Sequence, residues 1–342
     1  MHAVRMMTIG GPNVLKYEQV ADPTPKAGQV LVKVHACGVC GFDCRTREGL
    51  PGYHTPPGTV LGHEFAGDVV ALGAGVTEFA IGDRLTVVQQ GYCGTCEYCM
   101  SGRHTICPNY HETTYGSEGL PGGYADLVVV EVKTAVKVPP GVSYRDAAIA
   151  ACGIGVSLHA LNRVGARMGH RVLVTGAGGG LGIHALQLAR IAGCHVIAAT
   201  TSEAKAEHLR KYADDVILYR NGKFELDGER PDIIVENTAG HTLPASLRTI
   251  KRGGKIVIAG MVGTDPVPFM PGPFFAREIE LIGSNATTKH ELQEVLRLLA
   301  QKKIEAVVSH ELPLSEAAKA HQMLDAGVAF GRVVLIPDGI GK

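Results

Sequence analysis

Short apolar runs separated by glycine and proline turns fill the first 140 residues. Residues 30–34, 84–88 and 124–130 have the alternating or continuous apolar character of strands, and residues 56–58 and 139–141 are typical breaks. Many short strands with frequent turns favour an irregular β-barrel over a helical domain.

The pattern changes from about Tyr144. A buried-strand run at 172–175 leads into a glycine loop, a helical pattern over 181–192 and a second strand at 195–199. This alternation predicts βαβ units and a parallel sheet. Further strands are expected at 233–235, 256–259, 280–282 and 333–336, and further helices at 289–301 and 315–325.

Length and charge narrow the class of protein. A chain of 342 residues has room for about two domains. Its 33 basic residues balance 33 acidic ones, which gives no electrostatic reason to expect nucleic acid or an anionic membrane as a partner. The start of the sequence lacks a signal-peptide core, and no run of about 18 apolar residues occurs, so we expect a cytoplasmic protein.

The glycine loop lies between a predicted strand and a predicted helix. Glycines there allow a tight turn and let backbone N–H groups approach a pyrophosphate at the helix N-terminus. In this strand–loop–helix context the loop predicts dinucleotide binding. The expected cofactor-binding residues of the loop are Gly176, Gly178, Gly179, Gly180, Leu181 and Gly182.

The end of the second strand indicates which dinucleotide is bound. An acidic residue there would bind the ribose hydroxyls of NAD and repel the extra phosphate of NADP. This chain has Thr200, Thr201 and Ser202 instead, followed by Lys205, whose side chains suit a 2′-phosphate. Glu203 is expected only to begin the next helix. We therefore predict that NADP(H) is preferred over NAD(H).

Four cysteines cluster as Cys93-x2-Cys96-x2-Cys99-x7-Cys107. Because the sequence shows no export signal, a metal site is favoured over disulfides. Four thiolates at this spacing suit a tetrahedral structural Zn²⁺. An iron–sulfur run is the alternative, and a proline does follow the last cysteine, but that run needs a final gap of three residues rather than seven.

A second set of possible ligands is spread along the chain. Cys40, His63 and Cys152 taken singly could be ordinary buried residues. Together they make a Cys2His set that leaves a fourth position for water or substrate, as in catalytic zinc sites. The sequence thus predicts two Zn²⁺ per chain.

In these motifs, and in their order, the chain resembles the zinc-containing medium-chain alcohol dehydrogenases over nearly its whole length. The resemblance implies that Cys40, His63 and Cys152 hold the catalytic zinc and that Glu64 can enter its coordination. It also implies that Asp43 orients the histidine. Arg332, in the run Gly-Arg-Val-Val, matches an arginine that contacts the cofactor pyrophosphate.

The resemblance also implies an α/β architecture with two domains. A GroES-like β-barrel catalytic domain is expected over residues 1–155, with a structural zinc lobe at 91–110. A Rossmann domain with a doubly wound parallel sheet is expected over 156–289, and the chain should return to the catalytic domain over 290–342. Homodimers or homotetramers are usual in the family.

Two positions depart from the alcohol dehydrogenase pattern. Phe42 replaces a serine or threonine, and Arg45 replaces a histidine, of the relay that moves the alcohol proton to solvent. The segments 182–190, 200–205 and 286–289 look like the acryloyl-CoA reductase and quinone reductase branches, which reduce a C=C bond conjugated to a carbonyl.

Three functions are therefore considered. The first is a zinc-dependent NAD(P)(H) oxidoreductase that acts on a small-molecule carbonyl or alcohol. The second is an NADPH-dependent enoyl reductase of α,β-unsaturated carbonyl or acyl-CoA compounds. The third, a nucleic-acid or protein-binding module built on the four-cysteine lobe, is disfavoured by zero net charge and by the dinucleotide motif.

The remaining cysteines and histidines are expected to be structural. Cys37, Cys44 and Cys194 should bind no metal, with Cys194 buried in the sheet. Tyr53, His54 and Tyr115 are candidates for the substrate cleft by their sequence neighbourhood alone.

Overall fold

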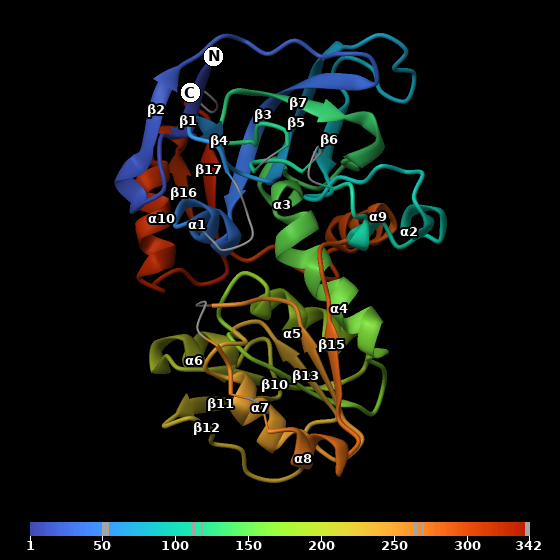
Figure 1. Ribbon diagram of the computed structural model, residues 1–342, viewed down its shortest axis with the longest axis vertical. Coiled ribbons are helices and arrows are strands. Elements are labelled where there is room, and N and C mark those ends of the chain that lie inside the picture. Colours follow the sequence, from blue (N-terminus) through green and yellow to red (C-terminus); the bar gives the residue numbers. More distant parts are fainter. Residues whose placement is uncertain (50–54, 111–113, 118, 263–265, 269, 339–342) are drawn as a thin grey trace. The chain divides into compact units, whose positions relative to one another are not determined.

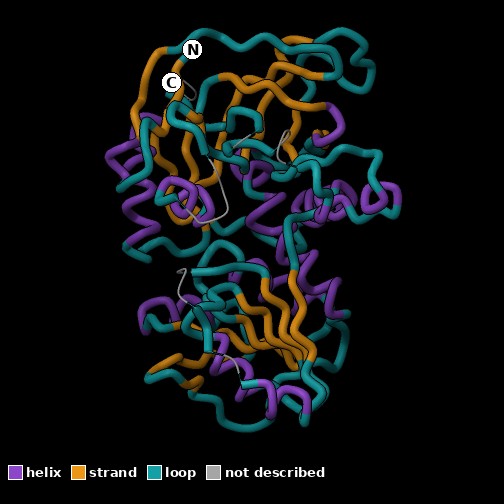
Figure 2. The backbone as a smooth tube through the Cα atoms, viewed as in Figure 1, coloured by secondary structure: helices purple, strands orange, loops and turns teal. Residues whose placement is uncertain are grey.

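The computed structural model describes residues 1–49, 55–110, 114–117, 119–262, 266–268 and 270–338. The chain forms two compact units, each with its own β-sheet system (Figures 1 and 2). One unit comprises Met1–Gly155 and Ala286–Lys342, and the other comprises Val156–Asn285.

The unit Val156–Asn285 is built on a seven-stranded sheet of order β12-β11-β10-β9-β13-β14-β15. Its pairs are parallel except for β11 with β12. Leaving out the short β12, this is the 3-2-1-4-5-6 order of the dinucleotide-binding Rossmann fold. The strands are β9 (Arg171–Val174), β10 (His195–Thr200), β11 (Asp215–Arg220), β12 (Lys223–Phe224), β13 (Ile233–Glu236), β14 (Lys255–Ile258) and β15 (Glu280–Gly283).

Strand burial explains why the sequence pattern was readable in this unit. The side chains of Val172, Leu173 and Val174 in β9 are all buried, as are those of β13, so the strands appear as continuous apolar runs. The helices are α4 (Val156–Val164), α5 (Gly182–Ile191), α6 (Glu203–Leu209), α7 (Leu243–Thr249) and α8 (Pro271–Phe275).

The other unit is a mainly antiparallel β structure. One sheet has the order β16-β17-β3-β5-β6-β8, with β7 also paired to β3, and a smaller sheet has the order β2-β1-β4. Strand β17 pairs with β3, which joins the C-terminal segment to the N-terminal barrel. The strands are β1 (His2–Met6), β2 (Leu15–Gln19), β3 (Gln29–Val39), β4 (Thr59–Val60), β5 (Glu64–Leu72), β6 (Arg84–Val87), β7 (Leu127–Glu131), β8 (Ala135–Lys137), β16 (Val308–Pro313) and β17 (Arg332–Ile336).

Short helices surround this barrel. They are α1 (Gly41–Arg47), α2 (Glu97–Met100), α3 (Tyr144–Ala148), α9 (Lys289–Ala300) and α10 (Ala317–Asp325). Helix α9 starts where Thr288 and Glu291 form a capping box, in which each side chain accepts the other residue's backbone N–H.

Candidate metal centres and nucleotide-binding loop

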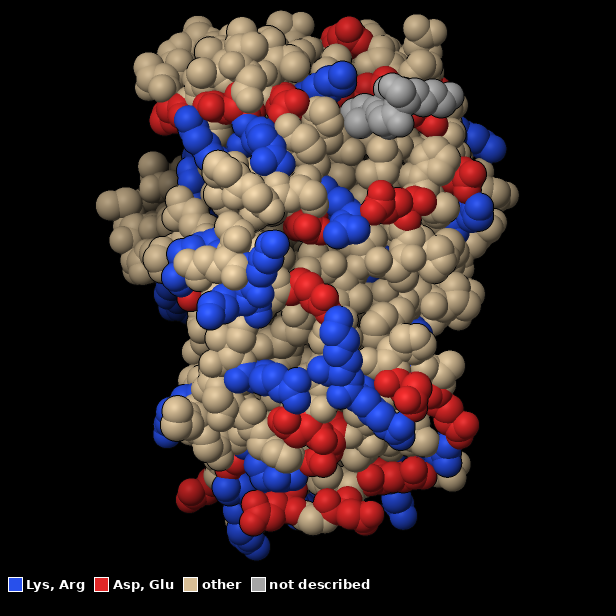
Figure 3. All heavy atoms as spheres, turned by 180° about the vertical axis from the view of Figure 1, so that it is seen from behind, with Lys and Arg blue, Asp and Glu red and all other residues tan. Residues whose placement is uncertain are grey.

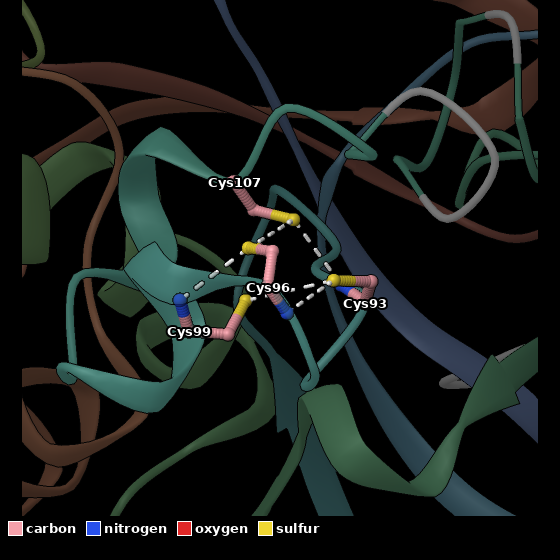
Figure 4. Close-up of side chains that lie close together, drawn as sticks. All are labelled: Cys93, Cys96, Cys99 and Cys107. Atoms are coloured by element: carbon pink, nitrogen blue, oxygen red, sulfur yellow. Dashed lines mark hydrogen bonds between the residues drawn. The ribbon is translucent and has the colours of Figure 1, made fainter.

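The four clustered cysteines form a compact group of thiols. Their sulfur atoms all lie within 4.8 Å of one another, and all four point toward a common centre (Figure 4). The distances Cys93 Sγ–Cys99 Sγ and Cys96 Sγ–Cys107 Sγ are both 3.9 Å. A Zn–S bond of about 2.3 Å gives tetrahedral S–S edges of about 3.8 Å. The group therefore fits one tetrahedral ion better than a cluster in which each thiolate binds a different iron.

The local backbone also favours thiolates in this lobe. Cys93 Sγ accepts the N–H groups of Thr95 and Cys96, each at 3.4 Å, and these bonds lower the pKa of Cys93 to about 5. The thiol of Cys96 caps α2 by accepting the Cys99 N–H at 3.5 Å. Backbone donors thus stabilise the thiolate of Cys93, whereas burial raises the pKa of Cys99 to about 12.

The second set of ligands comes together from three distant segments. One ligand atom each of Cys40, His63, Glu64 and Cys152 lies within 4.8 Å of the others, and all four residues are buried. Cys40 Sγ and Cys152 Sγ are 3.8 Å apart, again the edge of a zinc–thiolate tetrahedron. The hydrogen bond from the Cys152 thiol and the charge of Arg332 hold the pKa of Cys40 well below its usual value.

The start of α1 fixes Cys40 of this set together with the carboxylate of Asp43. Cys40 is the N-cap residue: its thiol accepts the Phe42 N–H at 3.5 Å, and its own N–H donates to Asp43 Oδ2 at 2.9 Å. This is a capping box made with a cysteine and an aspartate. The same short segment therefore supplies one expected metal ligand and the carboxylate expected to orient another.

Cys152 and His63 lie on less regular backbone. Cys152 lies in a single stretch of π-helix, Ala150–Gly155, all of whose residues are buried. Such stretches are frequent at functional sites. His63 follows Gly62, whose φ is +93°. A Cβ at Gly62 would lie 2.4 Å from the ring of Tyr124, so only glycine fits there.

Asp43 contacts the imidazole of His63 as the resemblance implied. The distance from His63 Nδ1 to Asp43 Oδ1 is 3.1 Å, and both side chains are buried. An Nδ1–H that donates to the carboxylate leaves Nε2 free to bind a metal.

Glu64 forms an ion pair with Arg332 inside the site. Glu64 Oε1 is 2.9 Å from Arg332 Nη2, which also lies 3.4 Å from Cys152 Sγ. Burial raises the pKa of Glu64 to about 7, although Arg332 opposes this shift. A Cβ at Gly38 would lie 2.5 Å from Glu64 Oε2, so β3 leaves room for the carboxylate only because it carries glycine there.

Arg332 was expected at the cofactor pyrophosphate. Its Nη2 is engaged by Glu64 and Cys152, while its buried Nε has no hydrogen-bond partner among the described residues. The contact with pyrophosphate stays a prediction. Sequence reasoning missed its contacts with Glu64 and Cys152.

Phe42 and Arg45, which replace the hydroxyl and the histidine of the alcohol relay, are both among the described residues. The ring of Phe42 meets the imidazole of His63 edge-on, with centroids 5.7 Å apart. Arg45 pairs with Glu48 at 2.6 Å. The position expected to carry a hydroxyl is therefore filled by an apolar ring.

The glycine loop connects β9 to α5, as expected for a nucleotide-binding loop. Gly176 has a φ of +56°, and a Cβ at Gly182 would lie 2.4 Å from the carbonyl oxygen of Gly176. The first and last glycines are therefore required by the turn and by the close approach of loop and helix.

The end of β10 has the polar character predicted for it. Thr200 is buried and its hydroxyl accepts the Ser202 N–H at 3.2 Å, whereas Thr201 is exposed. Lys205 is half-buried against Gly178, and its pKa is lowered by burial. Glu203 is the first residue of α6 and forms an ion pair with Arg220.

Three residues were predicted to line the substrate cleft, and the structure describes one of them. Tyr115 was a candidate, but this was wrong: its ring is fully buried against Phe65, and its hydroxyl pairs with Thr134 at 2.7 Å. Tyr53 and His54 lie outside the described residues.

Three cysteines were predicted to bind no metal, and this stays a prediction; Cys194 was also predicted to lie in the sheet, but it precedes β10. Cys37, Cys44 and Cys194 are free thiols and buried. Cys194 donates to the carbonyl oxygen of Arg167 at 3.3 Å, just before β10.

No helix within the described residues is long and apolar enough to cross a membrane. Figure 3 shows Lys and Arg side chains interspersed with Asp and Glu on the visible face. The described residues drawn there make a mixed surface, in line with the balanced composition.

Comparison with known proteins identifies the two parts of the chain. A profile of the alcohol dehydrogenase GroES-like domain matches residues 26–140, and a profile of zinc-binding dehydrogenases matches residues 180–301. With the strand orders above, these matches confirm the predicted fold class, a GroES-like barrel with a Rossmann-type parallel sheet.

Similar proteins extend over nearly the full length. The chain is 36% identical over 321 residues to acryloyl-coenzyme A reductase of Metallosphaera sedula, covering 93% of this chain and 95% of the relative. It is 30% identical over 336 residues to an alcohol dehydrogenase of Geobacillus stearothermophilus, covering 95% and 96%. The crystal structure of AibC superposes with a TM-score of 0.90 at 38% identity, covering 98% of this chain and 96% of that one.

Proposed function

Since the chain belongs to the zinc-binding, alcohol dehydrogenase-like family of medium-chain oxidoreductases, we propose that it reduces a C=C bond conjugated to a carbonyl, with NADPH as hydride donor. The substrate class that we favour is the α,β-unsaturated acyl thioester. The products would be the saturated thioester and NADP⁺, with the hydride on the β-carbon and a proton on the α-carbon.

The observation that carries this proposal is the ring of Phe42 beside His63. Oxidation of an alcohol requires a group that accepts the hydroxyl proton. A phenyl ring neither donates nor accepts a proton, and the guanidinium of Arg45 is paired with Glu48. An enoyl substrate has no hydroxyl proton to lose, so this departure from the relay is compatible with its reduction.

The relatives support the same choice. Acryloyl-coenzyme A reductases of Metallosphaera sedula and Sulfurisphaera tokodaii are 36% and 31% identical to the chain. Acryloyl-coenzyme A, the compound in their name, is an acyl thioester with a conjugated C=C bond. This agrees with the segments that already looked like the reductase branches.

Zinc held by Cys40, His63 and Cys152 would polarise the substrate carbonyl, and bound NADPH would supply the hydride. Within the chain, Asp43 keeps Nε2 of His63 available to the metal. Glu64 is near enough to the ligand atoms to join them, and its partner Arg332 balances its charge. Phe42 places an apolar ring edge-on against His63, with the ring centroids 5.7 Å apart.

A second candidate, reduction of an aldehyde or ketone, is favoured by a specific observation. The Cys2His set with a nearby carboxylate is complete, and a zinc ion there acts equally well on a carbonyl oxygen. Reduction needs only a proton from water, so the missing relay impairs it less than it impairs alcohol oxidation.

Further properties belong to the same proposal. We propose two Zn²⁺ per chain, one in the four-cysteine lobe, and a preference for NADP(H) that rests on Thr200, Thr201, Ser202 and Lys205. The nine free thiols suit a reducing cytoplasm. A homodimer or homotetramer is expected from the family.

The test is a substrate panel with identified products. Acryloyl-coenzyme A, a longer enoyl thioester, an enone, an aldehyde and a ketone are each offered with NADPH and with NADH. We expect kcat/KM for an enoyl thioester to exceed that for the best aldehyde by at least about 10-fold, a difference of about 1.4 kcal/mol. An aldehyde or ketone as best substrate would favour the second candidate, and no NAD(P)H consumption with any of them would contradict both.

A further inference from the structure

Behind Asp43 lies a line of buried polar side chains that the proposed reaction does not use. Tyr124 Oη is 3.3 Å from Asp43 Oδ2 and 3.1 Å from His321 Nε2. His321 Nδ1 is 3.2 Å from Arg47 Nη1. Tyr124, His321 and Arg47 are all less than 2% exposed. Tyr124 comes from a loop, His321 from α10 and Arg47 from α1, so the line joins three separate segments of the barrel unit.

The chemistry of Arg47 gives the line a direction. A guanidinium only donates hydrogen bonds, so His321 Nδ1 must be the acceptor. A neutral imidazole that accepts at Nδ1 carries its proton on Nε2, which therefore donates to Tyr124 Oη. The tyrosine hydroxyl, having accepted that bond, is free to donate its own proton to Asp43 Oδ2.

The line meets the metal ligand at Asp43. Oδ2 of the carboxylate receives the Tyr124 hydroxyl and the Cys40 N–H at 2.9 Å, while Oδ1 faces His63 Nδ1 at 3.1 Å. With Oδ2 occupied by donors, the carboxylate presents Oδ1 as an acceptor to the imidazole. His63 must then carry its proton on Nδ1, which leaves the Nε2 lone pair for a metal.

The outer end of the line, Arg47, is held in place, and the next residue, His321, is kept neutral. Arg47 donates to Asp325 Oδ2 at 2.8 Å, to Glu48 Oε1 at 2.7 Å and to the carbonyl oxygen of Gly10 at 3.0 Å. Burial lowers the pKa of His321 to about 4, which keeps the imidazole neutral at physiological pH. A neutral His321 has one donor and one acceptor, as the line needs.

We propose that Tyr124, His321 and Arg47 are positioning residues for His63: their hydrogen bonds, all donated toward Asp43, fix the orientation and tautomer in which the imidazole binds the metal. This inference rests on the proposed metal site at Cys40, His63 and Cys152. It adds three residues to that site which touch neither metal nor substrate.

The test is the rate at which zinc leaves the folded protein in the presence of a chromophoric chelator. The variants are Tyr124→Phe, which removes one hydroxyl, His321→Phe, which removes both ring nitrogens, and His321→Gln. Glutamine offers an amide donor toward Tyr124 and a carbonyl acceptor toward Arg47, so it is the matched rescue. A Cys40→Ala protein, which keeps only the four-cysteine site, identifies the release phase of that site.

We expect Tyr124→Phe and His321→Phe to speed release from the Cys2His site by about 10-fold, the lower end of the effect of losing an outer-shell partner. Release from the four-cysteine site should be unchanged, and His321→Gln should stay within about twofold of the wild type. In Co²⁺-loaded protein, the visible absorption bands should shift in the two disruptive variants and return in His321→Gln.

The possible outcomes distinguish failure of the proposed metal site from failure of the positioning role. Wild-type protein that binds no metal through Cys40 would overturn the proposed metal site itself. Zinc held there, but released at the wild-type rate in Tyr124→Phe and His321→Phe, would overturn only the positioning role. Equal acceleration in His321→Gln and His321→Phe would also overturn it, since volume rather than hydrogen bonding would then matter. Should His321→Phe fail to fold, Tyr124→Phe decides the question alone.

Discussion

Replacing Phe42 by threonine tests the reading of the site most directly. The substitution places a hydroxyl at the second residue of α1, beside His63, where the alcohol dehydrogenase pattern has a serine or threonine. We expect oxidation of small primary alcohols by NADP⁺ to become faster, while reduction of the best enoyl substrate changes by less than about threefold. The hydroxyl should matter only to the reaction that must release an alcohol proton.

The size of the effect can be bounded. A well-placed general acid–base group contributes about 10²- to 10⁴-fold. Here Arg45, paired with Glu48 at 2.6 Å, leaves the outer half of the relay absent, so we expect only about 10-fold. The lost edge-to-face contact between Phe42 and His63 costs about 0.5–1.5 kcal/mol of stability, which a folded enzyme of this size should survive.

The assay is kcat/KM for alcohol oxidation from pH 6 to 9 in the wild type, Phe42→Thr and the matched control Phe42→Ala. Alanine removes the phenyl ring without adding a hydroxyl, so it distinguishes the effect of the added space from the effect of the hydroxyl. The wild type and Phe42→Ala should be slow near neutral pH and rise with pH, and Phe42→Thr should be faster at every pH. Equal rates in the two variants, or fast wild-type oxidation that is flat over this range, would refute the reasoning.

Three further substitutions test the metal sites and the cofactor preference. Cys96→Ser should lose one zinc and lower Tm by several degrees, at roughly 2–4 °C per kcal/mol, because structural zinc binding contributes to folding free energy. Metal analysis that finds two zinc ions in this variant would contradict the assignment of a zinc site to the four-cysteine lobe. Cys40→Ala should also lose one zinc and nearly all reductase activity, with a circular dichroism spectrum like that of the wild type; retained activity would mean that this metal is not needed. Thr200→Asp should turn a preference for NADPH into one for NADH, because a carboxylate repels the 2′-phosphate. The ratio of the two kcat/KM values should change by at least about 10-fold. A wild type that already prefers NADH would contradict the interpretation of residues 200–205 as a phosphate-binding segment.

The parts of the fold that sequence reasoning found are those specified by local patterns. Strands β9, β10, β13, β14 and β15 were predicted to within about two residues. The first four are wholly or largely buried, and buried parallel strands are continuous apolar runs between loops, whereas β15 is mostly exposed. The glycine loop and the four-cysteine lobe are equally local. A prediction fails where local pattern and tertiary pairing diverge: residues 124–126 were predicted as strand, but β7 begins at Leu127.

Side-chain partners were less accessible to sequence reasoning. Nothing near His321 in the sequence indicates that its imidazole meets Arg47, which is 274 residues away. Tyr115 seemed a cleft residue from its neighbours, yet packing placed it in the core. The Glu64–Arg332 pair joins the start of β5 to the start of β17, and only the sheet order brings those ends together.

The four-cysteine lobe and the Cys2His set depend on the fold to different degrees. This difference bears on what a metal would do in each site. The four-cysteine ligands span 15 residues, from 93 to 107, so the lobe can form its site with little help from the barrel. The residues of the other set are 23 and 89 positions apart along the chain, from 40 to 63 and from 63 to 152. Loop-closure entropy opposes their meeting in an unfolded chain, so the folded barrel must supply their arrangement. A zinc ion in the lobe would thus stabilise structure, whereas one in the barrel would be held in a site that the fold has already organised for chemistry.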